Sequence, residues 1–322
     1  MNYETIPGVK KRLSRICLGT MIVTTDRLEE SFALLDAALA RGVNTLDTAY
    51  VYGGGKTEVA VGKWFAARGN RDDVVLIGKG AHPDTSGSKV NPKGITSDLT
   101  ESLSRFGIEH IDVYMLHRDD PSSPVGPIVE TLNEHRAAGR IGAFGGSNWR
   151  HERVREANEY AYAHGLVGFD VSSPNFGLAE QVDNPWGPGC VSLSGPKEAA
   201  ARAWYAETKT AIFAYSSIGR GFFSGRITRE NYEDVADGAC RKAYCHEVNF
   251  RRLDRARELA ARKNLSVAQI ALAYVLNQPL NVFALVGAAN ADEIAANDAA
   301  SEVKLTAEEL AWLNLERESV EA

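Results

Sequence analysis

Cysteine is scarce in this sequence: the 322 residues include only Cys17, Cys190, Cys240 and Cys245, and no two of them form a CxxC pair. A disulfide-stabilised or zinc-ribbon fold normally has more cysteines in closer pairs. Cys240, Cys245 and His246 are near neighbours, but structural zinc sites use four well-spaced ligands, so we expect reduced thiols in a helical stretch. The seven histidines include no HxH pair, which argues against a metal-dependent hydrolase. We therefore expect no metal site.

Positive charge is not in excess either. The 36 lysines and arginines are outnumbered by 42 acidic residues, which gives a formal net charge of -6. Proteins that follow nucleic-acid phosphates carry a basic surface instead. The N-terminal stretch has no positive-then-apolar signal organisation, and no apolar run reaches the length of a membrane span. These absences predict a cytoplasmic protein that binds neither nucleic acid nor a membrane, and they leave its oligomeric state open.

The sequence does contain a regular alternation of short apolar runs and longer amphipathic stretches. The expected strands are 15–19, 44–49, 74–80, 110–117, 141–148, 167–172, 211–216 and 282–287. The expected helices are 28–42, 57–69, 96–106, 124–138, 150–164, 196–208, 266–277 and 291–300, followed by a last helix capped by Thr306 with Glu309 three residues later. Eight βα units without an internal linker predict one domain over 1–322, a parallel (β/α)₈ TIM barrel with extended loops, although a doubly wound sheet has the same periodicity.

Three segments, 81–94, 173–195 and 217–247, are too long for minimal βα connections. Each follows an expected strand, so in a barrel all three gather over one mouth, where binding loops are found. The strands also deliver polar residues to that mouth. The second ends at Asp47 with Tyr52 in its loop, the third at Lys79 and the fourth at His117. Titratable groups of complementary type converging on one place predict an active site.

These residues lie within motifs that resemble the aldo-keto reductase family. NTLDTAYVYGGGKTE (44–58) resembles its signature, and VLIGKG (75–80) and YMLHRDDP (114–121) resemble the segments that carry its catalytic lysine and histidine. GGSNW (145–149), AYSSIGRGFFSGR (214–226) and LVGAANADEIAANDAA (285–300) resemble its three cofactor segments. The resemblance covers nearly the whole chain, with six motifs in the family's order. It implies an NAD(P)H-dependent enzyme that reduces an aldehyde or ketone to an alcohol, or catalyses the reverse.

The resemblance assigns four catalytic residues, Asp47, Tyr52, Lys79 and His117. Tyr52 is the expected proton donor to the carbonyl oxygen, and Lys79 beside it is expected to lower the pKa of the phenol. Asp47 is expected to pair with Lys79, and His117 to orient the substrate oxygen. Tyr50 also lies near Asp47, but the family's spacing favours Tyr52 as the acid. No metal is required.

The same resemblance predicts the cofactor contacts. They are Gly19, Thr20, Asp47, Ser147, Asn148, Asn175, Tyr215, Ser216, Ile218, Gly219, Arg220, Gly287, Ala289, Asn290, Glu293 and Asn297. Asn175 stands where the family usually has a glutamine. Around Asn290 and Glu293 there is no lysine or arginine to hold a 2′-phosphate, although Arg220 or Arg226 could replace it, so the choice between NADP(H) and NAD(H) stays open.

The substrate pocket is expected to include Tyr50, His82, Arg118, Trp149 and Trp186. Arg118 could bind a hydroxylated or acidic substrate, or pair with Asp119 or Asp120. A sugar or another polyhydroxylated carbonyl is the preferred small-molecule substrate. The main alternative is a regulatory subunit of this family that binds nicotinamide nucleotide and a protein partner without significant turnover.

Overall fold

The computed structural model describes residues 1–320, so the last two positions of the predicted domain lie outside the described residues. Eight parallel strands close into a barrel in the order β10-β3-β4-β5-β6-β7-β8-β9. The barrel strands are β3 (Ile16–Gly19), β4 (Thr45–Asp47), β5 (Val75–Gly80), β6 (Ile111–Leu116), β7 (Ile141–Ser147), β8 (Val171–Ser173), β9 (Ala211–Ala214) and β10 (Val282–Val286). This confirms the predicted TIM barrel and excludes the doubly wound sheet, because β10 pairs with β3 and leaves no open edge.

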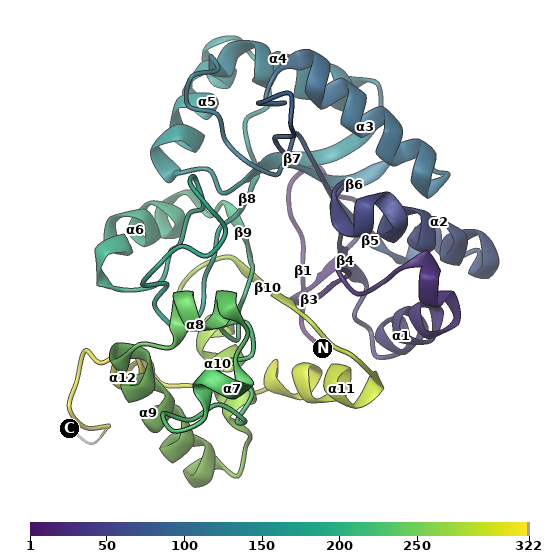
Figure 1. Cartoon of the computed structure of the whole chain (residues 1–322). Coiled ribbons are helices and arrows are strands. Elements are labelled where there is room, and N and C mark those ends of the chain that lie inside the picture. Colours follow the sequence, from purple (N-terminus) through teal and green to yellow (C-terminus); the bar gives the residue numbers. More distant parts are fainter. Residues whose placement is uncertain (321–322) are drawn as a thin grey trace.

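Helices form an outer ring around these strands (Figure 1). They are α1 (Leu28–Ala40), α2 (Lys56–Arg68), α3 (Pro92–Phe106), α4 (Val125–Ala137), α5 (His151–Ala163), α6 (Ala199–Thr208), α7 (Tyr232–Val235), α8 (Gly238–Tyr244), α9 (Glu247–Lys263), α10 (Val267–Leu276), α11 (Ala291–Ala300) and α12 (Ala307–Leu313). None of the helices within residues 1–320 combines the length and apolarity that crossing a membrane requires.

Alternation along the strands separates two cores. In β3, Cys17 belongs to the cluster inside the barrel, while Ile16 and Leu18 pack outward under the helices. This is the two-residue period of a strand, applied to a closed sheet that is buried on both faces. The inner cluster also includes Ile6 and Leu13, which come from the segment of the short hairpin β1 (Tyr3–Glu4) and β2 (Leu13–Ser14). The N-terminal segment therefore contributes to the core inside the barrel.

The helix ends follow the capping residues. α12 begins with the predicted capping box of Thr306 and Glu309, and α10 has a second one. α3 starts earlier than expected because Asn91 caps it and Pro92 stands in its first turn, which shortens the insertion predicted at 81–94. β8 lies at Val171–Ser173 and not at 167–172, since 167–170 form an irregular approach to the strand.

The largest element that the sequence reading missed is α9, of 17 residues. Its buried residues Phe250, Leu253, Ala256 and Leu259 recur at helical spacing, so the signal was present among its many charged residues. The predicted insertion 217–247 is also partly helical, because it contains α7 and α8. In Figure 1 these three helices lie together on one side of the barrel.

Candidate functional site

A cavity of about 720 Å³ opens at the mouth formed by the carboxyl ends of the barrel strands. Its wall includes residues that end or follow each of the eight barrel strands, together with parts of the long loops. The lining residues are Gly19, Met21, Ile22, Asp47, Val51, Tyr52, Gly53, Lys79, His82, His117, Arg118, Ser147, Asn148, Ser173, Trp186, Cys190, Tyr215, Ser216, Ser217, Ile218, Arg220, Gly221, Leu285, Val286, Gly287, Ala288 and Ala289. In TIM-barrel enzymes this end of the barrel carries the active site.

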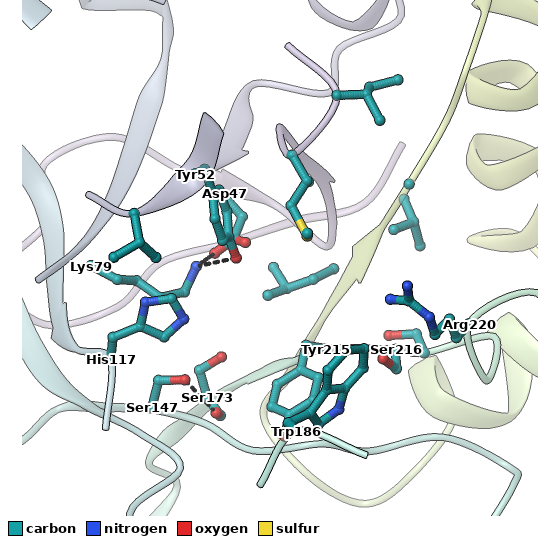
Figure 2. A pocket seen from close by; sticks show the side chains of 18 of the residues that line it. Asp47, Tyr52, Lys79, His117, Ser147, Ser173, Trp186, Tyr215, Ser216 and Arg220 are labelled. Atoms are coloured by element: carbon teal, nitrogen blue, oxygen red, sulfur yellow. Dashed lines mark hydrogen bonds and ion pairs between the residues drawn. The ribbon is translucent and has the colours of Figure 1, made fainter. Parts of the chain in front are cut away.

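One side of the cavity holds the four predicted catalytic residues (Figure 2). The Lys79 ammonium donates to Asp47 Oδ1 at 2.5 Å and to the Thr48 carbonyl at 2.9 Å, and its Nζ lies 3.5 Å from the Tyr52 hydroxyl. Asp47 ends β4 and Lys79 lies in β5, and these strands pair in parallel. Because the side chains leave neighbouring strand ends, the barrel itself brings the ion pair together.

Tyr52 is placed by a tight turn and not by a strand. It begins a 3₁₀ turn, Tyr52–Gly55, in which Gly53, Gly54 and Gly55 all have positive φ. That backbone favours glycine, and a Cβ on Gly55 would lie 2.7 Å from Cζ of Arg105. The Arg105 guanidinium also donates to the Tyr50 carbonyl and to Glu58, which holds this turn from the side of α3.

Burial controls the electrostatics of the ion pair. Burial lowers the pKa of Lys79, but the Asp47 carboxylate and the Tyr52 phenol raise it by more, so the pKa of Lys79 lies above its ordinary value. Burial also raises the pKa of Asp47, and the attraction of Lys79 opposes that rise. Each charge therefore depends on the other, as in buried ion pairs generally. Lys79 is a permanent cation beside the phenol at neutral pH.

Two opposing effects act on the pKa of Tyr52. Burial raises the pKa, and Lys79 lowers it as the sequence predicted, but by less, so the pKa lies above its ordinary value. The consequence is that the phenol stays protonated through the neutral range, which is the form that can donate a proton.

His117 is buried at the end of β6 and faces Tyr52, with ring centroids 6.0 Å apart. Burial, and then the charge of Lys79, hold the pKa of His117 well below its ordinary value, so the imidazole is neutral. Its Nδ1 is buried and has no hydrogen-bond partner in the described chain. The ring of His82 packs edge-on against it at 5.1 Å. A buried imidazole nitrogen without a partner beside a cavity is suited to a ligand atom.

Ser147 and Ser173 lie next to His117, and Tyr215 and Ser216 lie further along the cavity (Figure 2). The Ser147 hydroxyl donates to the Ser173 carbonyl at 3.0 Å. The Tyr215 hydroxyl donates to Asn148 Oδ1 at 2.8 Å, and Asn148 in turn donates to Ser147 Oγ at 3.2 Å. These bonds tie the ends of β7, β8 and β9 into one wall.

Two of the long loops meet across Arg220. Its guanidinium lies 4.7 Å from the centre of the Trp186 ring and donates to the Asp237 carboxylate at 2.8 Å. Trp186 belongs to the 173–195 segment, and Arg220 and Asp237 belong to the 217–247 segment. The Trp186 indole nitrogen is buried and, within residues 1–320, has no hydrogen-bond partner. The two loops therefore form one joined edge of the cavity.

The third part of the wall is the segment from β10 to α11. Gly287, Ala288 and Ala289 line the cavity, while the predicted contacts Asn290, Glu293 and Asn297 do not line it and bond to the chain itself. Asn290 caps α11 by accepting from the Glu293 amide, Glu293 accepts from the Ala289 amide at 2.8 Å, and Asn297 donates to the Gly287 carbonyl at 3.3 Å. The Glu293 amide in the first turn of α11 is thus capped by the chain itself.

Two predicted pocket residues do not line the cavity. The Tyr50 ring lies against Arg105 and Lys89, and its hydroxyl donates to Glu101, which raises the pKa of Tyr50 to about 12. Trp149 is fully buried and its indole donates to the Arg118 carbonyl at 3.1 Å. Both predictions are corrected, because sequence adjacency to a strand end does not decide which way a side chain points.

Three predicted cofactor contacts also lie outside the wall. Thr20 is buried, with its hydroxyl bonded to the Asp47 carbonyl, and Gly219 forms a turn with φ of 63° behind its lining neighbours. Asn175 is fully buried: its amide nitrogen donates to Tyr244 at 2.8 Å and its oxygen accepts from Ser192 at 2.8 Å. Both polar atoms of its side chain bond to other loops. The asparagine that replaces the family's usual glutamine therefore has a structural role here.

The sequence reading missed several lining residues. Met21, Ile22 and Val51 form an apolar rim, with 65%, 47% and 39% of their surfaces exposed. Exposed apolar side chains grouped at a cavity mouth are typical of a binding site, and their position directly after Thr20 and Tyr50 could have drawn attention to them. Ser173 and Cys190 were missed as well; Ser173 ends a strand whose position was shifted in the prediction, and Cys190 lies in the long loop that follows it. Within residues 1–320, no three His, Cys, Asp or Glu side chains gather to form a possible metal site.

Comparison with known proteins places the chain in a family. The sequence model of the Aldo/keto reductase family matches residues 15–314. The chain is 26% identical to the uncharacterized oxidoreductase YrpG of Bacillus subtilis (98% of this chain, 95% of the relative) and 28% identical to the norsolorinic acid reductase stcV of Emericella nidulans (93% and 77%). It is 26% identical to a probable voltage-gated potassium channel subunit beta of Oryza sativa (94% and 92%). The chain therefore belongs to the aldo/keto reductase family and is an NAD(P)H-dependent oxidoreductase.

Proposed function

We propose that this oxidoreductase reduces an aldehyde or ketone to an alcohol, or catalyses the reverse, with Tyr52 as the proton donor. The observation that carries the proposal is the position of Lys79, whose ammonium contacts both Asp47 and the Tyr52 hydroxyl at the cavity wall. His117 completes the group, with its ring centroid 6.0 Å from that of Tyr52. An acid, a charged neighbour and a neutral hydrogen-bonding imidazole are what protonation of a carbonyl oxygen needs.

The wall formed by Ser147, Asn148 and Tyr215 fits a nicotinamide cofactor. The Ser147 hydroxyl lines the cavity, Asn148 is held beside it by bonds to Ser147 and Tyr215, and the partly exposed Tyr215 ring offers a flat face. Gly287 leaves open space where any other residue would place a Cβ, so a ligand can approach its backbone closely. A bound reduced nicotinamide supplies the hydride that adds to the carbonyl carbon.

The residues of the chain itself then donate the proton and assist its transfer. The Tyr52 hydroxyl donates its proton to the carbonyl oxygen as negative charge develops there. Lys79 favours this transfer because its positive charge stabilises the phenolate that remains. Asp47 holds Lys79 in place at 2.5 Å and compensates its buried charge. The neutral His117 donates a hydrogen bond to the same oxygen and orients the carbonyl.

We further propose that NADH is bound at least as tightly as NADPH. Glu293 already accepts the Ala289 amide beside the cavity, so a carboxylate occupies a donor that a 2′-phosphate would need. Of the two cations expected to compensate, Arg220 is paired with Asp237, and the exposed Arg226 does not line the cavity. A phosphate without a free cation is poorly held, whereas a ribose hydroxyl has no such requirement.

The substrate preference for a sugar or other polyhydroxylated carbonyl stays a prediction. His82, His117 and Arg118 supply polar groups that favour it, while the rim of Met21 and Ile22 favours a substrate with an apolar part. Turnover of a set of sugars against a set of apolar aldehydes, at equal cofactor, separates the two. The cytoplasmic location also stays a prediction.

The alternative is a regulatory subunit, and the relative named as a probable potassium channel subunit beta favours it. Such a protein would bind the nucleotide without significant turnover. The test is therefore titration of the purified protein with NADH and NADPH by tryptophan fluorescence, followed by a turnover assay with a carbonyl panel. Binding with turnover supports the reductase, binding without turnover supports the alternative, and binding of neither contradicts both.

A substitution at Glu293 tests the preference between NADH and NADPH. Glu293→Lys replaces a carboxylate by a cation at the start of α11, and we expect the affinity for NADPH to rise about tenfold relative to NADH, the gain of one charge-assisted contact. Glu293→Gln serves as the control that removes the negative charge without adding a positive one. If the ratio of NADPH affinity to NADH affinity is unchanged in Glu293→Lys, the proposal that the 2′-phosphate would lie beside Glu293 is contradicted.

A further inference from the structure

Arg118 follows His117 directly at the end of β6, and its partly buried side chain lines the cavity. Its Nη1 donates to the carbonyl of His117 at 3.0 Å, a bond to its own neighbour. A guanidinium has five N–H donors in a planar fork, so most of its donors remain for other partners. The residue is therefore a cation with spare hydrogen-bonding capacity inside the proposed active site.

The carboxylates next to Arg118 in the sequence do not pair with it. The Asp119 carboxylate accepts from Arg153 at 3.5 Å. The Asp120 carboxylate accepts from the amide and hydroxyl of Ser122, at 3.0 Å and 2.6 Å. Among residues 1–320 no carboxylate lies within 4.0 Å of the Arg118 nitrogens in an ion pair. The sequence left open whether Arg118 pairs with Asp119 or Asp120, and the structure excludes both.

Of the cations that line the cavity, Arg118 is the one without a carboxylate partner among the described residues. The cavity is lined by three cations, Lys79, Arg118 and Arg220, and by one carboxylate, Asp47. Lys79 is neutralised by Asp47, and Arg220 by Asp237 just outside the wall. Arginine does not lose its proton in proteins, and a partly buried charge without a counter-charge is unfavourable. Arg118 is thus the cation that an anionic ligand would neutralise.

The position of Arg118 points to the substrate. Arg118 is bonded to the His117 carbonyl and lines the same cavity as His117 and Tyr52. These two residues are the ones proposed to contact the carbonyl oxygen. A group bound by Arg118 would therefore belong to the same molecule as the carbonyl.

We propose that Arg118 is a specificity-determining residue that binds a carboxylate of the carbonyl substrate, so that the site prefers oxo acids and carboxylated aldehydes to neutral carbonyls. The inference rests on the proposed carbonyl reduction. A guanidinium fork matches a carboxylate with two parallel hydrogen bonds, which a lysine cannot reproduce.

The test uses substrate pairs in which a methyl ester replaces the carboxylate and removes its charge: glyoxylate, 4-oxobutanoate and 4-carboxybenzaldehyde, each beside its methyl ester. We expect the wild type to favour at least one acid over its ester in kcat/KM. Arg118→Met should reduce kcat/KM for that acid about 10- to 100-fold, the loss of a charge-assisted bidentate contact, and change the ester by less than about threefold. Arg118→Lys should restore part of the loss through charge alone.

Arg155→Met is the matched control, because Arg155 is exposed on α5 and paired with Glu159. It should leave every acid-to-ester ratio unchanged. Thermal melting of each variant separates loss of selectivity from loss of folding.

The outcomes separate this inference from the proposed function. If esters and acids are reduced equally and Arg118→Met changes neither, the inference is overturned while carbonyl reduction stands. If Arg118→Met weakens the binding of NADH or NADPH alone and keeps the acid-to-ester ratio, Arg118 binds the nucleotide and the inference is overturned. If no carbonyl is reduced by the wild type although cofactor binds, the proposed function itself fails.

Discussion

Removing the hydroxyl of Tyr52 is the most direct perturbation of the proposed chemistry. The hydroxyl has one polar contact of note, 3.5 Å from Lys79 Nζ, which is at the limit of a hydrogen bond. Lys79 keeps its bonds to Asp47 and to the Thr48 carbonyl when the hydroxyl is gone. We therefore expect Tyr52→Phe to melt within a few degrees of the wild type and to bind cofactor with unchanged affinity.

The chemical step should respond very differently. General acid catalysis contributes about 10²- to 10⁴-fold, or about 3 to 5 kcal/mol of activation free energy, and all of it is lost with the proton donor. The assay is single-turnover oxidation of bound NADH by saturating aldehyde, followed at 340 nm, a wavelength at which only the reduced cofactor absorbs. This measurement removes cofactor binding and product release from the observed rate.

Tyr50→Phe is the matched control. It deletes the same atom two residues away, where the hydroxyl bonds to Glu101 outside the cavity. Its single-turnover rate should equal that of the wild type. A Tyr52→Phe rate within about threefold of the wild type would refute the assignment of the acid, because no positioned proton donor is that dispensable. Equal losses in both variants would indicate a general effect on the loop instead.

Two further predictions concern pH and packing. The kcat for reduction should be flat between about pH 7 and 9. The lowered pKa of His117 keeps the imidazole neutral above its ordinary value near 6.5, and the raised pKa of Tyr52 keeps the phenol protonated below its ordinary value near 10. A titration midpoint inside this window would contradict these directions of the two pKa shifts. Gly145→Ala should cost about 3 kcal/mol or more in urea unfolding, because a Cβ would lie 1.8 Å from the Val171 carbonyl between β7 and β8. Gly238→Ala, at a position in α8 with open space, should be neutral or stabilising by about 0.5 kcal/mol, and an equal loss in both variants would contradict the packing argument.

The sequence by itself determined the eight βα units and favoured a barrel, and the pairing of β10 with β3 decided that the sheet closes. Each barrel strand is a short apolar run between glycines or polar residues, and several helices have a capping residue at their start, so their alternation could be read locally. It also located the four proposed catalytic residues, because a parallel barrel brings successive strand ends to one mouth whatever the details of packing. Asp47 and Lys79, 32 residues apart, meet for this reason.

The sequence did not determine which way the neighbouring side chains point. Tyr50 and Tyr52 are two residues apart near the same loop, yet Arg105 and Glu101 hold Tyr50 outside the cavity while the glycine turn begins at Tyr52. Arg118 and Trp149 both follow strand ends, but Trp149 packs into the core and donates to the Arg118 carbonyl. These orientations depend on partners from other βα units.

The tertiary structure also determined the pKa of Tyr52 and the partners of the charged residues. The sequence suggested that Lys79 lowers the pKa of Tyr52, and only the fold shows that burial has the larger, opposite effect. Likewise, Arg118 stands beside two aspartates in the sequence, and the fold assigns one to Arg153 and the other to a serine turn. Secondary structure is encoded in nearest neighbours along the chain, whereas burial and ion pairing depend on neighbours in space, which the folded barrel alone supplies.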